Sequence, residues 1–132
     1  MRRWKLFSSA VGGASALEFA LILPVFATLL FGTIQVGLAL YFAGTVQYVL
    51  ERTARMVMVD QTMSVGQAKQ AFAAQLAAYT DQHITLNYAV DGSGTIPIAQ
   101  LSAAYVHEFI IPFVPSFSVT FDAQERVPLK PA

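Results

Sequence analysis

The chain opens on one long hydrophobic stretch and then changes to shorter, striped segments. No charged side chain occurs over positions 19–50, a run of 32 residues. The hydrocarbon core of a bilayer needs only about 20 residues of helix to cross it. A helix over 14–59 would be about 69 Å long at 1.5 Å per residue, roughly twice the thickness of that core. The pattern therefore predicts one transmembrane helix, about half of which projects from the membrane.

Two features inside the hydrophobic stretch bear on its shape and contacts. Pro24 has no N–H group, so the carbonyl oxygen of Ala20 loses its helical partner and we expect an interruption or kink there. Neighbouring helices can satisfy the groups that a proline frees. Small residues at four-residue spacing let two helices approach closely, although glycine is also common in membrane helices in general. The candidates for helix packing are Pro24, Gly32, Thr33, Gly37, Ala39, Ala43 and Gly44.

Beyond Tyr41 the long helix becomes amphipathic. Apolar side chains fall on one helical face and polar or charged ones lie mainly off it, which is typical of a helix that leaves lipid and buries one side. The face that we expect to be buried consists of Val46, Val49, Leu50, Thr53 and Val57.

A second, shorter helix is predicted to begin after Ser64. Ser64 is a good N-cap, and Gln67 follows it in the register of a capping box. The apolar face of this helix consists of Val65, Ala68, Phe72, Leu76 and Tyr79. We expect this face to pack against the sheet that follows.

From Ile84 onward the hydrophobic period falls to two, which predicts strands at about 84–90, 101–109 and 117–122. The segment Asp91-Gly92-Ser93-Gly94 is predicted to be a turn, because it lacks both a following helix and the regularly spaced acids of a calcium loop. Prolines at 112 and 115 bracket a loop, and 127–132 is expected to form an extended, frayed tail.

These elements predict an α+β fold in three parts. A basic segment at 1–13 precedes the transmembrane and projecting helix at 14–59. A small domain at 60–132 then contains the short helix and an antiparallel sheet of about three strands.

Composition and charge set the orientation of this architecture. Hydrophobic residues make up 55% of the chain and charged residues only 12%, as in membrane-anchored proteins. Arg2, Arg3 and Lys5 precede the hydrophobic stretch without any acid, whereas five basic and seven acidic residues follow it. Because positive flanks stay on the cytoplasmic side, we expect the amino terminus inside and the small domain outside.

Candidate catalytic groups are few. The only histidines are His83 and His107, and there is no cysteine. His107 and Glu108 are adjacent on a predicted strand, so their side chains should point to opposite faces. The hydrolase and metal-binding motifs of histidine, glutamate and serine are absent, and the exported part has no basic patch for nucleic acid. We expect a structural or interaction protein without enzyme activity, metal site, cofactor or nucleic-acid partner.

The basic start and the hydrophobic stretch could also be a conventional secretory signal peptide. Such a peptide has an apolar region of about 7 to 15 residues that closes on a small-x-small cleavage site. Here the region is about twice that length. The nearest such site, Gly37-Leu38-Ala39, lies deep inside the stretch. We therefore expect the stretch to be retained as an anchor.

The segment 13–24 resembles the leader and first helical turns of type IV prepilins, and especially those of the TadE-like proteins of tight-adherence (Flp) pilus systems. Gly13 matches the residue before the cleavage site, Ala14 is the first residue after it, and Glu18 and Phe19 match the fifth and sixth. Phenylalanine is frequent at the position of Ala14 in other type IV pilins. Ala54-Arg55 and the strand that begins at Tyr105 are also similar to elements of the TadE-like family.

The resemblance implies roles for these residues. A prepilin peptidase would cut after Gly13 on the cytoplasmic face of the bacterial inner membrane and create an ammonium group on Ala14. The carboxylate of Glu18 would neutralise that ammonium on an adjacent subunit. The alternative is that Glu18 merely extends to the membrane interface.

The resemblance also implies a function and partners. The 119 residues after Gly13 exceed the length of the major Flp pilin, which favours a minor pilin or pseudopilin with a periplasmic domain. Its expected partners are the prepilin peptidase, other pilin subunits, the inner-membrane assembly machinery and the lipid bilayer, and it could enter the extracellular pilus. The alternative is an uncleaved single-span protein whose outer domain scaffolds a secretion or envelope complex.

Overall fold

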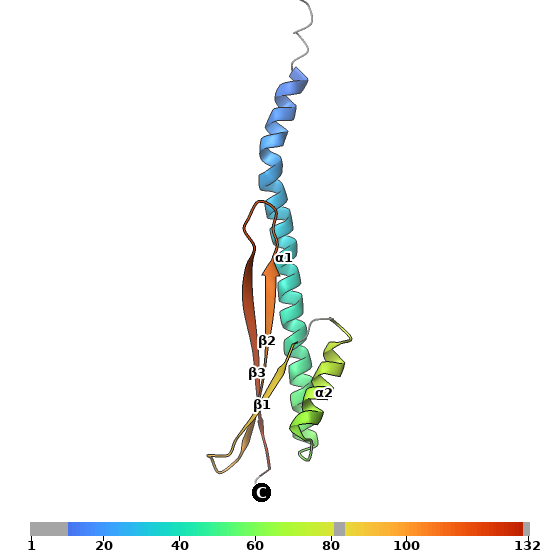
Figure 1. Cartoon of the computed structure of the whole chain (residues 1–132), viewed down its shortest axis with the longest axis vertical. Helices are drawn as coiled ribbons and strands as arrows, with labels where there is room; N and C mark the ends of the chain where they lie inside the picture. Colours follow the sequence, from blue (N-terminus) through green and yellow to red (C-terminus); the bar gives the residue numbers. More distant parts are fainter. Residues whose placement is uncertain (1–10, 81–83, 131–132) are drawn as a thin grey trace, which may run out of the picture.

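The computed structural model describes residues 11–80 and 84–130 as two helices and one sheet. The elements in chain order are α1 (Val11–Val59), α2 (Val65–Leu76), β1 (Leu86–Asp91), β2 (Ile98–Phe109) and β3 (Phe117–Pro128). α2 and the sheet, together called the head, lie beside the C-terminal part of α1, and the N-terminal part of α1 extends beyond them (Figure 1). The predicted α+β class is confirmed. Arg2, Arg3, Lys5 and His83 lie outside the described residues.

The amphipathic end of α1 forms one side of the hydrophobic core. All five residues of the predicted face, from Val46 to Val57, are buried. Each completely buried aliphatic side chain of this size contributes about 1.5 to 3 kcal/mol to folding. The polar member, Thr53, donates its hydroxyl hydrogen to the carbonyl oxygen of Val49 at 2.9 Å, so its burial leaves no unpaired group. The helical pattern therefore predicted the core face of α1 correctly.

The sheet provides the other side of the core. Its strand order is β1-β2-β3, with antiparallel pairs such as Leu86 with Ala103 and Tyr105 with Phe121. β2 is central, and alternate side chains along it are buried, as strand geometry requires. The predicted face of β2 is confirmed: it holds Leu101, Ala103, Tyr105, His107 and Phe109.

Several strand boundaries differ from the prediction. β1 runs from Leu86 to Asp91 rather than from 84 to 90. β2 begins at Ile98 rather than Leu101, because Ile98 pairs with both Asp91 and Pro128. β3 continues to Pro128. The expectation of a frayed tail from position 127 was therefore wrong for Val127 and Pro128. Val127 is only 1% exposed and belongs to the core. A proline can end β3 because this strand lies at the sheet edge, where one row of N–H groups has no strand to pair with.

α2 has the predicted capping box. The N–H of Ser64 donates to the Gln67 side chain at 2.8 Å, and the N–H of Gln67 donates to the Ser64 hydroxyl at 3.3 Å. Ala68, Phe72 and Leu76 are buried, and α2 contacts both α1 and β1 rather than the sheet alone. The outer ends of the predicted face, Val65 and Tyr79, are exposed.

The segment after β1 is a turn, as predicted. The hydroxyl and the N–H of Ser93 both donate to the Asp91 carboxylate, at 2.6 and 3.0 Å. These two hydrogen bonds, the side-chain one first, hold the pKa of Asp91 below its ordinary value. The carboxylate is thus used to close the turn between β1 and β2.

α1 is continuous through Pro24 and is not interrupted there. The hydroxyl of Thr28 donates to the carbonyl oxygen of Pro24 at 2.8 Å. The kink expected at Pro24 stays a prediction. The continuity matters because it makes the membrane segment and the head-bearing segment parts of one helix.

Replacing Phe72 by alanine should lower the free energy of unfolding by about 3 to 5 kcal/mol, because it opens a cavity between α2 and the rest of the core. Val65→Ala, on the exposed edge of the same helix, should cost less than about 1 kcal/mol. Urea unfolding of both variants in detergent, followed by circular dichroism, measures the difference. Equal losses would contradict the described position of α2.

Candidate functional site

The predicted cleavage position lies in the first turn of α1. The helix begins at Val11, so the bond between Gly13 and Ala14 is already helical. Gly13 is exposed, and a β-carbon added there would meet nothing within 4 Å. The first N–H groups of a helix have no intrahelical partner, so this turn is held more weakly than the interior of the helix. The bond after Gly13 is therefore near the described N-terminal end of α1.

Glu18 and Phe19 lie one turn further along α1. Glu18 is exposed, and it stands four residues after Ala14, so the two residues share a face of the helix. Phe19 is also exposed, at 65%. The head does not reach this part of α1 (Figure 1). The carboxylate of Glu18 is thus directed away from the chain's own core and toward the surroundings of the helix.

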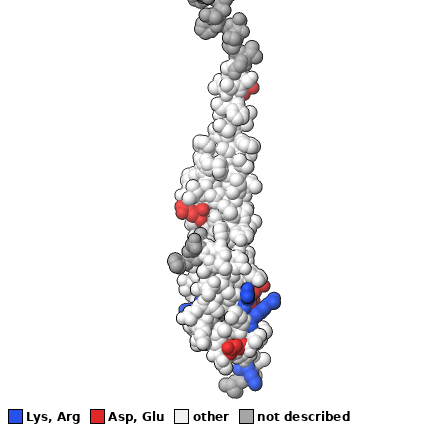
Figure 2. All heavy atoms as spheres, turned by 90° about the vertical axis from the view of Figure 1, so that its right-hand side faces the viewer, with Lys and Arg blue, Asp and Glu red and all other residues white. Residues whose placement is uncertain are grey.

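The N-terminal part of α1 has the properties of a membrane span. Gly13–Val59 is long and apolar enough to cross a membrane. Large apolar side chains are exposed around the whole helix here, including Leu17, Leu21, Ile22, Val25, Phe26 and Leu29. Charged groups gather instead near the opposite end of the molecule (Figure 2). Such a distribution is costly in water and favourable in lipid. The helix indicates a membrane-anchored, single-pass protein.

The predicted packing residues divide between two sides of α1. Gly32, Ala39 and Ala43 face the head: Ala39 is buried, Ala43 packs on the core, and a β-carbon at Gly32 would lie 3.8 Å from Ile111. A β-carbon at Gly37 or Gly44 would meet nothing within 4 Å. Helical geometry aligns these two glycines with Thr33 on the side away from the head.

Of the predicted packing residues, Gly37 and Gly44 lie with Thr33 on the uncovered side of α1. Their packing against a second helix stays a prediction. The described hydrogen bond at Pro24 lies within α1, where its carbonyl oxygen accepts from the Thr28 hydroxyl.

A polar cluster that the sequence analysis did not predict fastens β2 to α1. One ring nitrogen of His107 lies 2.6 Å from the Tyr105 hydroxyl, and the other lies 3.0 Å from the side-chain oxygen of Gln35. The amide nitrogen of Gln35 also donates to the carbonyl oxygen of Ile110 at 3.2 Å. The available signal was Gln35 itself, an amide side chain within a long uncharged helix.

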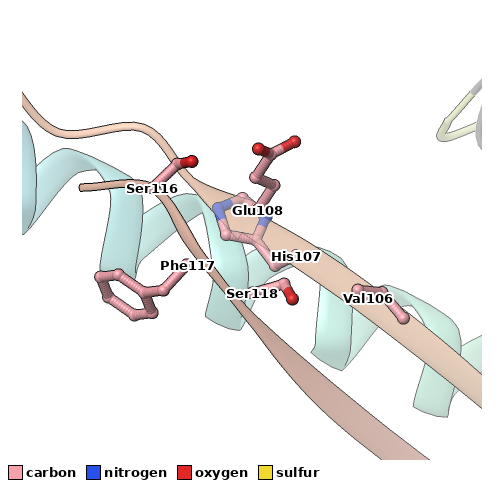
Figure 3. A pocket seen from close by; sticks show the side chains of 6 residues that line it. All are labelled: Val106, His107, Glu108, Ser116, Phe117 and Ser118. Atoms are coloured by element: carbon pink, nitrogen blue, oxygen red, sulfur yellow. The ribbon is translucent and has the colours of Figure 1, made fainter.

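His107 and Glu108 differ in burial and in hydrogen bonding. His107 is 8% exposed, and both of its ring nitrogens are already engaged in the cluster with Tyr105 and Gln35. Glu108 is exposed on the other face of β2. Both residues line an open depression with Val106, Ser116, Phe117 and Ser118 (Figure 3). The alternating burial along β2 agrees with the expectation that the two side chains point to opposite faces. His107 contacts Gln35 of α1.

The fold and the exposed apolar helix define a class: a single-pass membrane protein with a small α+β head. The family model described as TadE-like protein matches residues 13–55. The match begins at Gly13 and ends at Arg55, so it contains every predicted processing residue and confirms the resemblance over that segment. The chain is consistent with a TadE-like protein of tight-adherence pilus systems. No curated protein and no solved structure matches it.

Replacing Gln35 by alanine should loosen β2 and the following loop from α1, because it leaves the His107 ring and the Ile110 carbonyl without their partner. We expect a loss of about 1 to 3 kcal/mol and faster amide exchange at 110–114. Thr33→Ala, which removes only a hydrogen bond to Leu29 within the same helix, is the control. Hydrogen exchange followed by mass spectrometry in detergent compares them. Equal protection in the two variants would count against the cluster as a fastening.

Proposed function

We propose that this protein is a minor pilin or pseudopilin that takes part in assembly of a tight-adherence (Flp) type IV pilus and is cleaved after Gly13 by a prepilin peptidase. The observation that carries the proposal is that the family match and the predicted cleavage motif begin at the same residue. The TadE-like match starts at Gly13, and Glu18 is the fifth residue after it. The residues that a peptidase and a neighbouring subunit would recognise are also exposed in the single chain.

The proposed topology follows from charge and burial. The basic residues at 2, 3 and 5 stay in the cytoplasm, the first half of α1 crosses the inner membrane, and the head lies in the periplasm. Release into a pilus would carry the head outward with the helix still attached. The uncovered side chains of α1 would then contact other pilin subunits instead of lipid.

Glu18 has a physical reason to require a partner. An unpaired carboxylate in an apolar environment is costly, whereas a close pair with an ammonium offsets much of that cost. Cleavage would create such an ammonium on Ala14, at the positive end of the helix dipole. Because Glu18 is exposed in one chain, it is free to meet the terminus of the next. The pair would fix the axial register of one subunit against another.

The proposed role is structural, and the protein would act through association. Its partners would be the prepilin peptidase, other pilin subunits and the inner-membrane assembly machinery, without nucleic acid. We propose no catalytic activity, since the buried histidine, His107, is engaged on both ring nitrogens. Thr33, Gly37 and Gly44 offer the side of α1 on which a neighbouring helix could approach most closely.

One observation favours a second candidate, an uncleaved single-span protein that scaffolds a secretion or envelope complex. α1 is helical through Gly13, so the bond to be cut would first have to unwind. The mature amino terminus, read by mass spectrometry, separates the two. A terminus at Ala14 supports the pilin, an intact Met1 or Arg2 supports the scaffold, and a start near Ala39 or Leu40 would contradict both.

Gly13→Ala should abolish processing when the protein is expressed with its peptidase, seen as slower gel mobility from the retained leader. The added methyl group meets nothing within 4 Å, so the change tests recognition rather than folding. Gly37→Ala makes the same change at an equally open helical position and should be processed normally. Normal processing of Gly13→Ala would refute cleavage at this site.

Glu18→Gln should be processed but enter pili at least about tenfold less than the unchanged protein, because an amide cannot neutralise the Ala14 ammonium. Asp122→Asn, an equivalent change at an exposed head position, should leave incorporation unaltered. Immunoblots of sheared pili against total membrane protein give the ratio. Incorporation of Glu18→Gln at the level of the unchanged protein would contradict the proposed pairing of Glu18 with the Ala14 ammonium.

A further inference from the structure

The loop between β2 and β3, here called the hairpin tip (110–116), exposes a cluster of large apolar side chains. Ile110 is 65% and Phe113 is 76% exposed, and Val114 and Phe117 are exposed beside them. Phe113 also has φ 66°, a backbone region that bulky residues rarely adopt. The chain thus holds an aromatic side chain outward at a conformational cost. An apolar cluster maintained in this way marks a contact surface.

The hairpin tip is fastened beside the uncharged half of α1, not at the free end of the head. The Gln35 amide donates to the carbonyl oxygen of Ile110. The Thr28 hydroxyl, whose one hydrogen is shared between two acceptors, lies 2.8 Å from the Pro24 carbonyl oxygen and 3.2 Å from that of Pro112. Between these two points Gly32 leaves room for Ile111. The loop therefore lies along α1 between Thr28 and Gln35 (Figure 1).

Two carboxylates bracket the zone that contains the hairpin tip. Glu18 stands on α1, and Glu108 follows His107, which reaches Gln35. From Glu18 to Gln35 the helix rises by 17 residue steps, or about 26 Å, close to the roughly 30 Å hydrocarbon core of a bilayer. Neither this part of α1 nor the chain over 109–121 carries a charge. The helix and the hairpin tip share one uncharged layer of membrane thickness.

The backbone of the hairpin tip is unusually well suited to lipid. Irregular backbone is tolerated at membrane depth only where its polar groups are satisfied by protein. Pro112 and Pro115 have no N–H group to satisfy. The carbonyl oxygen of Ile110 accepts from Gln35 on α1, and that of Ile111 accepts from the Val114 N–H at 3.2 Å. The carbonyl oxygen of Pro112 shares the Thr28 hydroxyl hydrogen with Pro24. These contacts lower the cost of placing this part of the loop in lipid.

We propose that the hairpin tip is a second membrane contact, which inserts beside α1 into the outer leaflet of the same bilayer. Ile110 and Phe113 lie among the acyl chains, and Glu108 lies at the level of the headgroups. The inference rests on the proposed topology, in which α1 spans the membrane from Glu18 outward. It adds that the head is held against the periplasmic surface of the bilayer by a protein–lipid contact of its own.

The test places a single tryptophan at chosen depths in the full-length chain. Trp4, the one natural tryptophan, is replaced by phenylalanine. Phe113→Trp is then reconstituted in phosphatidylcholine–phosphatidylglycerol vesicles with or without bromine on the acyl chains, which quenches nearby tryptophan. Leu21→Trp on α1 is the control for the span. Ile96→Trp, exposed at the opposite end of β2, is the control for water.

The proposal expects bromine to quench Phe113→Trp to an extent comparable with Leu21→Trp and several-fold more than Ile96→Trp. Quenching of Leu21→Trp but not of Phe113→Trp would overturn the inserted tip while leaving the span intact. An unquenched Leu21→Trp would instead overturn the membrane topology on which the inference rests.

A second position guards against a folding defect at the unusual backbone of Phe113. Ile110 directly follows β2 and does not have the positive φ of Phe113. Ile110→Trp should also be quenched. Blue-shifted emission from either position without bromine quenching would show that protein, such as a second copy of the chain, covers the tip. That outcome would also overturn the lipid contact.

Discussion

The burial of one face of α1 against β2 is the interaction on which the rest of the molecule depends. Val46, Leu50 and Val57 provide a hydrophobic stripe on a helix that is otherwise exposed, and Leu101 and Tyr105 provide its counterpart on the sheet. α2 closes the remaining side through Phe72. Without this contact neither the short helix nor a three-stranded sheet could bury enough apolar surface to be stable. The head is therefore built on the helix.

Since the head is built on α1, the position of the membrane anchor also fixes the position of the head. α1 runs without interruption from the region of Gly13 into the core, so no flexible connection separates the two. The cluster of Gln35, His107 and Tyr105 extends the contact beyond the hydrophobic stripe. It holds the end of the β2–β3 hairpin beside α1 at the level of Gln35. A contact made by the N-terminal part of α1 would therefore also orient the head, which is packed on the C-terminal part of the same helix.

The same arrangement divides α1 into surfaces with different uses. One side is covered by the head, and small residues such as Ala39 and Gly32 permit the close approach there. The opposite side, with Gly37 and Gly44, is uncovered and suits a neighbouring helix in a pilus or a complex. The first turns, with Glu18, are uncovered on all sides. Association would therefore occur through α1 without unfolding the head.

The sequence by itself determined the elements, because each is specified by local pattern. The 3.6-residue period marked the buried face around Leu50, the Ser64 capping box marked the start of α2, and the two-residue period marked the face of β2. The motif that contains Gly13 and Glu18 is also short and contiguous, and the processing role proposed for it stays a prediction. These features depend on residues within a few positions of one another.

Only the tertiary structure decided the contacts between distant segments. Pairing of Val127 with Ala99 turned an expected tail into a strand, because a sheet edge supplies hydrogen bonds that no local pattern records. The contact between Gln35 and His107 joins residues 72 positions apart. Whether Ala39 or Gly37 faces the head depends on how the sheet docks on α1. Such long-range pairing follows from which surfaces fit together in space, and periodicity along the chain does not encode it.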